Sequence, residues 1–346
     1  MTLASLRFPI ALLSLALVFS TWGCGGTTDG TGAPVITTDG ACTFGEVARA
    51  SGFVGGTASV DGTLVFAANG GQVFTSKADG TVAPIDVDAT EGQRLFALKD
   101  DVVIAWSSSP LSSSAVSRYH VADGSITMLD DVSSNGGIVR SAATDGTTIA
   151  WVRWLTPDDS TMTLERWSPA GRTSETIGEE VTGGVQSLAI AGDASYGIFH
   201  TEVDGGVIGR IPTGSQTKQV LVTLGDQIAT LVGADDAHVV YTTQSGDGTD
   251  WTLSSVPTNG GPPVVLATWS AAPTFVSNVL LFGSDVWWQE TRSDAPDQVD
   301  FFRAPVDGST PATQAMTTGL RATNFTVDAC GLVYGTQSGS LYREKP

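Results

Sequence analysis

The chain has 346 residues and three histidines, whose positions bear on acid–base and metal chemistry. His120 follows an arginine, His200 follows an aromatic residue, and His238 begins a β-like run. A metal site or a catalytic base pair requires such side chains to converge on one point. Because the three histidines fall at different positions of the repeat described below, we expect no catalytic residue, no resident metal and no cofactor.

Acidic residues gather in four segments that separate β-like runs. They are Asp158 and Asp159, Glu202 and Asp204, Asp247 and Asp250, and Asp294, Asp297 and Asp300. Carboxylates grouped in this way are weak candidates for a divalent cation site, and they would also attract a basic partner. The segment 245–250 has too few properly spaced oxygens for an EF-hand loop. The alternative interpretation is that these are ordinary solvated loop tips of an acidic chain.

An arginine recurs in five places, before a glycine turn in four of them and just before the end of the chain in the fifth. The five are Arg118, Arg166, Arg210, Arg303 and Arg343. A ring of guanidinium groups could bind an anion. Recurrence at one position favours the other interpretation, structural ion pairs with acidic turn residues such as Asp100, Asp145, Asp235 and Asp328.

Seven β-like runs, each ending in an aromatic residue, set the framework for these groups. The aromatic residues are 40 to 48 positions apart: Phe66, Trp106, Trp151, Phe199, Tyr241, Trp288 and Tyr334. That period accommodates four short strands with their turns, here called a, b, c and d, which is one blade of a β-propeller. Tryptophans at repeat positions should pack between blades, whereas Trp154 and Trp269 lie outside the strongest positions and could stack on a sugar or a partner.

The seventh copy ends after its third strand, at Pro346. The segment from Val35 to Val47 precedes the first copy and has no partner of its own. We therefore predict an all-β fold, a seven-bladed β-propeller of four-stranded antiparallel blades whose ring is closed by the N-terminal strand. One propeller domain should span residues 35–346. Two tandem β-sandwiches would not explain seven copies at a near-constant period.

The spacing within the repeat predicts where length varies. From an arginine to the next aromatic anchor the separation is 31 to 33 residues, whereas from an aromatic to the arginine of its own blade it is 9 to 15. Variation should thus lie in the b–c loops, which open on one face and carry the acidic residues. Binding function commonly resides in such loops on a rigid scaffold. We expect the opposite turns to be constant in length.

The first 23 residues have the pattern of a signal peptide, with Arg7 before an apolar run. The following Thr21-Trp22-Gly23-Cys24 resembles a bacterial lipobox. This resemblance implies acylation of Cys24, a flexible Gly/Thr tether over residues 24–34, and anchoring to the outer membrane. The alternative is conventional cleavage after Gly23, which would leave a periplasmic or secreted soluble protein.

Export changes what the cysteines imply, because two thiols in an oxidising compartment tend to pair. If Cys24 carries lipid, the remaining pair is Cys42 and Cys330, near the two ends of the exported chain. A disulfide between them would fasten the closure of the ring. Two buried free thiols are the alternative.

The repeat resembles the secreted bacterial β-propellers of the broad TolB-like and YWTD-like kind. Its fullest hairpin is Arg303-Ala304-Pro305-Val306-Asp307-Gly308. The resemblance implies the fold over residues 35–346 and leaves activity open, since this architecture hosts binding modules, lyases and quinoprotein dehydrogenases. We favour a non-enzymatic binding or scaffold module of the cell envelope over such an enzyme.

The charge balance limits the partners. The formal net charge is −19, with 36 acidic residues against 17 Lys and Arg. Nucleic acid is excluded because its binding depends on clustered basic residues, and contact with a membrane is expected through the lipid anchor alone. The expected partner is an unidentified envelope protein or polymer, which would be basic or bridged by cations.

Overall fold

The computed structural model describes most of the chain after residue 36. The described ranges are 37–39, 42–68, 71–77, 80–87, 93–107, 114–132, 137–154, 162–177, 187–201, 205–215, 217–246, 248–270 and 274–346. Every regular element in these ranges is a β-strand. No helix long and apolar enough to cross a membrane occurs among them. The predicted signal peptide, the tether and Cys24 lie outside the described residues.

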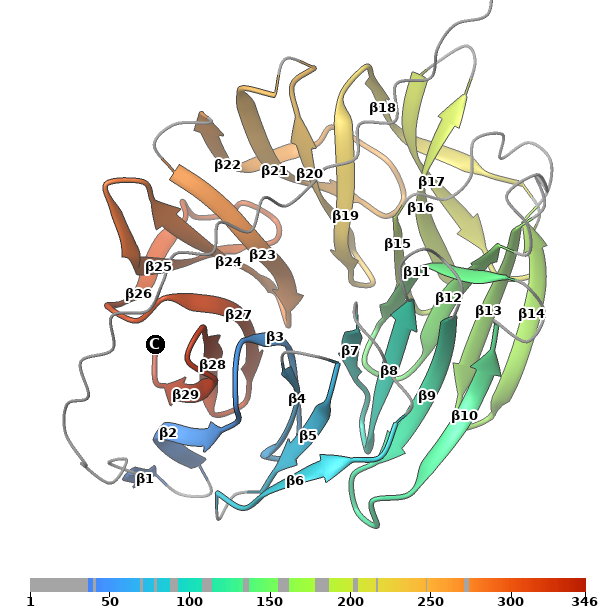
Figure 1. Ribbon diagram of the computed structural model, residues 1–346. Helices are drawn as coiled ribbons and strands as arrows, with labels where there is room; N and C mark the ends of the chain where they lie inside the picture. The colour runs from blue at the N-terminus through green and yellow to red at the C-terminus, as the bar shows by residue number, and fades with distance from the viewer. Residues whose placement is uncertain are drawn as a thin grey trace, which may run out of the picture. The chain divides into compact units, whose positions relative to one another are not determined.

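Seven antiparallel sheets follow one another along the chain (Figure 1). Blades one to three are β3 (Val54–Val60), β4 (Thr63–Ala68), β5 (Val73–Ser76) and β6 (Val82–Ile85); β7 (Arg94–Ala97), β8 (Asp101–Ser107), β9 (Ser114–His120) and β10 (Ile126–Asp131); and β11 (Ile138–Thr144), β12 (Ile149–Trp154), β13 (Met162–Ser168) and β14 (Gly171–Ile177). Blades four to six are β15 (Leu188–Ala191), β16 (Ala194–Thr201), β17 (Gly205–Pro212) and β18 (Gln219–Gly225); β19 (Ile228–Ala234), β20 (His238–Gln244), β21 (Asp250–Pro257) and β22 (Val264–Ser270); and β23 (Thr274–Phe282), β24 (Asp285–Arg292), β25 (Ala295–Pro305) and β26 (Thr313–Thr318).

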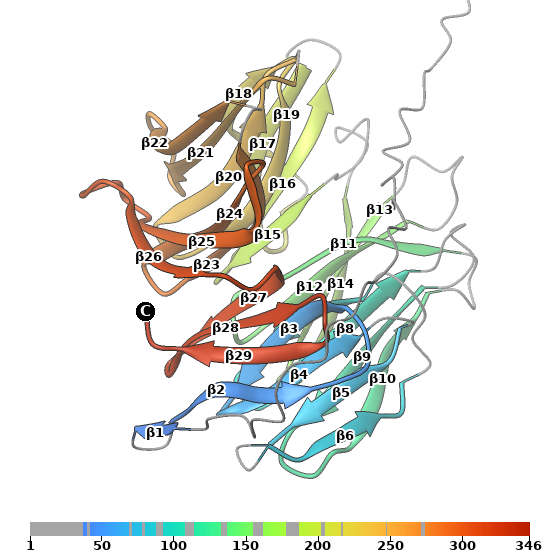
Figure 2. The same cartoon turned by 60° about the vertical axis from the view of Figure 1, so that its left-hand side comes forward.

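Blade seven takes its outer strand from the other end of the chain. β27 (Ala322–Asp328), β28 (Gly331–Thr336) and β29 (Ser340–Glu344) are joined by β2 (Cys42–Arg49), with the short β1 (Thr37–Asp39) paired to β2. Gly45 pairs with Arg343 and Arg49 with Ser340, and Figure 2 shows β2 lying along β29. The predicted closure is therefore confirmed. The described strand continues two residues past the predicted segment.

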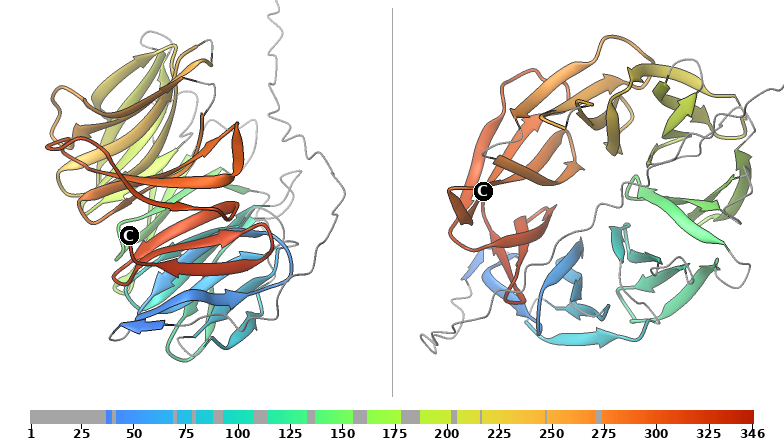
Figure 3. Two further views of the ribbon diagram at one scale, coloured as in Figure 1. Left: turned by 90° about the vertical axis from the view of Figure 1, so that its left-hand side faces the viewer. Right: turned by 45° about the horizontal axis from the view of Figure 1, so that its top comes forward.

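The first strand of each blade lies on the inside of the ring. These strands contact their neighbours in the order β3, β7, β11, β15, β19, β23, β27 and back to β3, so the ring is closed (Figure 3). Closure removes the exposed sheet edges at which open sheets aggregate. The fold class predicted from the sequence, a seven-bladed β-propeller, is confirmed.

Cys42 and Cys330 form a disulfide across 288 positions of sequence. The bond joins the start of β2 to the turn between β27 and β28, so it fastens the outer strand of blade seven to its inner hairpin. At the other end of the β2–β29 pair, Gly339 has a φ of 89°, and a Cβ there would collide with the carbonyl oxygen of Ala50. The backbone N–H of Ala50 in turn donates to the carbonyl of Gly339 at 2.9 Å. Only glycine fits this close approach.

The core lies between blades and uses the aromatic repeat. Trp151, Phe199 and Trp288 are each at most 1% exposed. Trp106, near the end of β8, is less deeply buried than these three. Trp167 is also half-buried, against the cluster that contains Trp151.

Candidate binding sites

Much of the predicted acidic crescent lies outside the described residues. Asp158, Asp159, Glu202, Asp204 and Asp247 are in this group, and the structure therefore leaves them as predictions. Among described residues, no three His, Cys, Asp or Glu side chains lie close enough to hold a metal ion.

The described acidic residues of the crescent belong largely to strands rather than loops. Asp250 begins β21, whereas Asp297 and Asp300 lie within β25. In blade six the b–c connection is the short turn 293–294. The b–c loop predicted for blade six is therefore a two-residue turn, and most of the predicted loop residues belong to strands β24 and β25.

Hydrogen bonds engage three of these carboxylates, and Asp250 accepts from the Ser270 hydroxyl at 3.2 Å. Arg292 donates to Asp294 at 2.6 Å and 2.9 Å, and this side-chain hydrogen bond lowers the pKa of Asp294. Asp300 accepts from Gln314 at 3.1 Å and also from the hydroxyl of Thr317. Asp297 is exposed, so it is the described member of the blade-six group that presents its charge most directly to solvent.

Length variation is not confined to the b–c loops. The c–d connection is 169–170 in blade three and 306–312 in blade six, and the d–a connection is 178–187 after blade three but 226–227 after blade four. The prediction of constant opposite turns was wrong for the c–d turns. The interval from arginine to aromatic stayed near-constant because a short c–d turn is offset by a long d–a connection.

An exposed tryptophan marks the b–c end of blade five. Ile228, Gln244, Trp251 and Trp269 are paired in one row across β19, β20, β21 and β22, and directly paired residues of antiparallel strands share a face. Trp251 is 36% exposed and Ile228 60% exposed. Asp250 precedes Trp251 and is exposed as well. The sequence analysis missed Trp251, because it does not occupy an anchor position of the repeat.

The row ends on the outer strand β22 at Trp269, which packs against the core between blades five and six. The Trp269 ring meets that of Trp288 edge-on at 5.8 Å. Both indole N–H groups donate to one carboxylate oxygen of Glu290, at 2.6 Å and 2.8 Å. Trp269 therefore packs and bonds within the protein, and half-buried Trp154 packs against the cluster between blades three and four.

Four of the five repeated arginines pair with a carboxylate. The N–O distances are 3.6 Å for Arg118 to Asp101, 3.4 Å for Arg210 to Asp193, 4.0 Å for Arg303 to Asp285 and 2.6 Å for Arg343 to Asp328. The ion-pair interpretation is confirmed for these four. Three of the four partners differ from the acids that the sequence indicated, and Asp328 is the one that agrees.

The described histidines also pair with acids of their own blades. His120 Nδ1 lies 2.8 Å from Asp101 in blade two, and His238 Nδ1 lies 3.7 Å from Asp235 in blade five. The two histidines therefore belong to separate networks in different blades. The side chain of His200 is outside the described part.

Arg166 is the exception among the arginines. It is 7% exposed, and its Nη2 donates to Ser195 Oγ of blade four at 2.7 Å. Its Nε–H is buried without an acceptor, as are those of Arg118, Arg210 and Arg343. What distinguishes Arg166 is that no described carboxylate lies within 4.0 Å of the guanidinium. Burial lowers the pKa of Arg166, while the more distant Glu175, Asp145 and Asp193 raise it.

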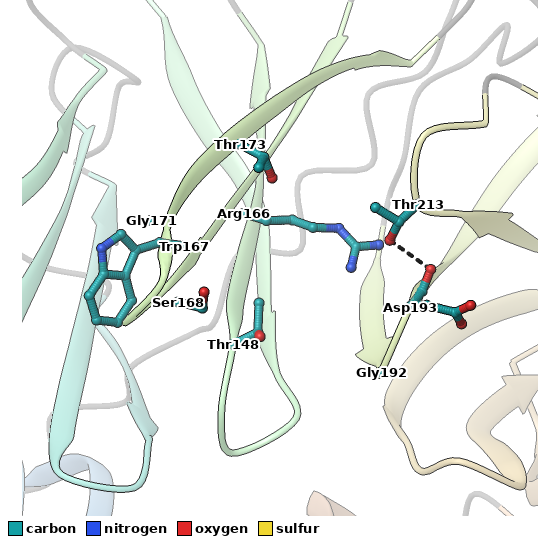
Figure 4. Close-up of a pocket in the computed structure, with 9 residues that line it drawn as sticks. All are labelled: Thr148, Arg166, Trp167, Ser168, Gly171, Thr173, Gly192, Asp193 and Thr213. Atoms are coloured by element: carbon teal, nitrogen blue, oxygen red, sulfur yellow. Dashed lines mark hydrogen bonds between the residues drawn. The ribbon is translucent and has the colours of Figure 1, made fainter.

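Arg166 lines a recess between blades three and four, with a volume of about 330 Å³. Figure 4 shows its side chain reaching from β13 toward Asp193 and Thr213. The lining also includes the hydroxyl residues Thr148, Ser168 and Thr173. All of these residues lie near the a–b and c–d turns, so the recess is at the end of the blades opposite to Trp251.

A second buried polar cluster joins blades two and three. Arg172 donates to Glu165 at 3.0 Å and to Asp130 at 3.1 Å, and the Trp151 indole N–H also donates to Asp130 at 2.9 Å. Arg153 lies 3.9 Å from Asp130. These charges compensate one another, so the cluster fastens the two blades together.

Comparison with known proteins bears on the fold. No family model matches the chain, and no curated protein matches it. Among solved structures, an oligogalacturonate lyase in complex with manganese has a TM-score of 0.59 at 13% identity, covering 91% of this chain and 96% of that one. Virginiamycin B lyase from Staphylococcus aureus has a TM-score of 0.53 at 13% identity, covering 84% and 94%.

TolB from Acinetobacter baumannii is a further and weaker match. Its TM-score is 0.48 at 10% identity, over 82% of this chain and 65% of that one. Likeness at such low identity shows the fold alone. The two lyase structures, both with TM-scores above 0.5, place this chain among β-propellers and transfer no activity to it.

Proposed function

We propose that this protein is a non-enzymatic binding module of the cell envelope, anchored by an acylated Cys24 to the outer membrane. Its working surface is the rim formed by the b–c ends of blades five and six, defined by Ile228, Asp250, Trp251, Asp294 and Asp297. The observation that carries the proposal is the exposed Trp251 beside exposed Ile228 and Asp250.

A rim of this composition favours a partner with both apolar and basic groups. Tryptophan supplies a large contact area and often dominates binding energy when a partner covers it. The carboxylates would steer a basic partner and fix its orientation. The acidic residues predicted in blades three and four, at 158–159 and 202–204, would extend this surface around the ring.

The groups best able to perform acid–base chemistry support the non-enzymatic interpretation. Asp101 is engaged by both His120 and Arg118, and Glu290 is held by two indole N–H groups. Such pairs stabilise blades. The alternative, an extracytoplasmic lyase or quinoprotein dehydrogenase, would require converging titratable groups in the segments outside the described residues.

The test is capture from envelope extract by residues 35–346, because the contacts group Pro34–Pro346 into one compact unit. One partner should be retained by the wild type and lost with Trp251→Ser. It should be retained less with Asp250→Asn combined with Asp297→Asn. The control Asp61→Asn removes one negative charge from an a–b turn on the opposite face, and asparagine tolerates the positive φ there. Each single rim substitution, Asp250→Asn or Asp297→Asn, is compared with it charge for charge.

Capture that is equal for the wild type and both rim variants would overturn the rim proposal. Turnover of an envelope polymer by the wild type, lost on substitution of a residue in the b–c loops, would overturn the non-enzymatic assignment.

A further inference from the structure

Arg166 lacks the counter-ion that the repeat supplies elsewhere, and the strand register shows why. Arg118 pairs with Val103 and Arg303 with Trp287. Their counter-ions, Asp101 and Asp285, lie two residues before those paired positions. Arg166 pairs with Ala150, and the residue two before it is Thr148. Blade three therefore has a hydroxyl where blades two and six have a carboxylate.

The turn acid of blade three does not replace the missing carboxylate. Asp145 Oδ1 accepts from the backbone N–H groups of Thr147 and Thr148, both at 2.8 Å, and from the Thr147 hydroxyl at 2.8 Å. Asp193 of blade four pairs with Arg210. Glu175 accepts from the backbone N–H of Gly214 at 3.1 Å.

A buried guanidinium without a counter-ion is costly, because desolvation of the charge is not repaid by a direct ion pair. The recess beside Arg166 leaves room for an ion from outside. Its volume of about 330 Å³ lies at the lower end of the range of small-molecule sites. The hydroxyls of Thr148, Ser168 and Thr173 border it (Figure 4). Hydroxyl groups and a guanidinium are both donors to anionic oxygen.

The surrounding acids select among anions. Asp145, Asp193 and Glu175 are near enough to act on Arg166 electrostatically without contacting it. They would repel a doubly charged phosphate or sulfate about twice as strongly as a singly charged group. A carboxylate is planar, carries one charge and matches the guanidinium fork in a bidentate arrangement.

We propose that the recess between blades three and four binds the carboxylate group of a small ligand, with Arg166 as its counter-ion and Thr148, Ser168 and Thr173 as hydroxyl donors. This site is separate from the rim and goes beyond the proposed function. A partner captured at the rim would neither require it nor establish it.

The test is an acetate titration of the purified full chain at constant ionic strength, maintained with chloride. The Arg166 Nε–H resonance, assigned by its loss in Arg166→Gln, should shift saturably with acetate. Phosphate and sulfate should shift it more weakly at the same concentration. Arg118→Gln, which changes the matched arginine of blade two, should leave the acetate titration unchanged.

The decisive variant is Thr148→Asp, which restores the counter-ion of the repeat. It should weaken acetate binding by about tenfold or more, since a carboxylate in place competes for the charge-assisted bonds. Its melting temperature should be retained or raised, so that loss of binding is not loss of fold. A non-saturable acetate response, or unchanged binding in Thr148→Asp, would overturn the site. Phosphate or sulfate binding as tight as acetate would overturn its assignment to carboxylates.

Discussion

Arg343 and Arg166 occupy the same position of the repeat in different electrostatic surroundings. Arg343 is 3% exposed and contacts Asp328, which also accepts from Ser59 of blade one at 2.6 Å. Arg166 is nearly as buried but donates to a neutral serine. One arginine thus belongs to a compensated pair at the closure of the ring, and the other carries a charge that no described carboxylate contacts.

These surroundings predict unequal effects of the same substitution. Arg343→Met should lower the free energy of unfolding by about 2 to 3 kcal/mol, because it leaves the largely buried carboxylate of Asp328, whose side chain is 13% exposed, without its counter-ion. Arg166→Met should cost about 1 kcal/mol or less, since it removes one hydrogen bond and also an uncompensated charge. Urea denaturation of both variants measures the difference. Equal losses would contradict the distinction between the two sites.

At the scale of elements, the repeat was readable because each blade must bury a large side chain against its neighbour. The aromatic anchor nevertheless moves along strand b. In blades three, six and seven the aromatic anchor is the residue immediately after the one that pairs with the repeated arginine. In blade four Arg210 pairs with Tyr196, and the anchor Phe199 lies three positions later. The Phe199 ring lies where a Cβ of Gly197 would be, so a later aromatic occupies the earlier position. The spacing of the repeat in the sequence does not show the direction in which the Phe199 side chain points.

For the same reason, sequence spacing alone did not identify the candidate site at Arg166. Sequence spacing correctly paired arginines with acids as a class, but it could not specify which acid. Asp145 precedes strand b as Asp328 does in blade seven, and both carboxylates cap their own turns through Oδ1. The second oxygen of Asp328 contacts Arg343, whereas Asp145 makes no such contact with Arg166. Once the strand register is known, Thr148 at the Asp101 position is the signal that identifies the unpaired Arg166.

The disulfide is the element on which closure should depend most. Because the Cys42–Cys330 bond spans 288 positions, the chain-entropy model gives about 5 to 6 kcal/mol as an upper contribution to stability. Reductant should therefore shift the denaturation midpoint downward, with the largest loss of hydrogen-exchange protection in β2 and β29. The double variant Cys42→Ser, Cys330→Ser should have the lower midpoint with or without reductant. A wild-type midpoint that does not change on reduction would contradict this role.

At the scale of the whole molecule, an acylated Cys24 would hold an acidic ring at the membrane surface. Intact mass of the mature protein, purified from a native-like host, should show loss of residues 1–23 and the mass increment of lipid. Without reductant, Cys42 and Cys330 should resist alkylation. A mature mass without lipid would contradict the anchor, and two alkylatable thiols in the untreated protein would contradict the bridge.

Binding of a partner to the rim of blades five and six is the property on which the proposed function depends. Hydrogen exchange of residues 35–346, measured with and without the captured partner, tests it most directly. Protection should appear at the start of β19, at the start of β21 around Trp251, and in the blade-six hairpin from Gln289 to Asp300. It should decrease at 1 M salt, where the screening length falls to about 3 Å. Protection confined to the a–b and c–d turns, or protection that salt leaves unchanged, would contradict the claim.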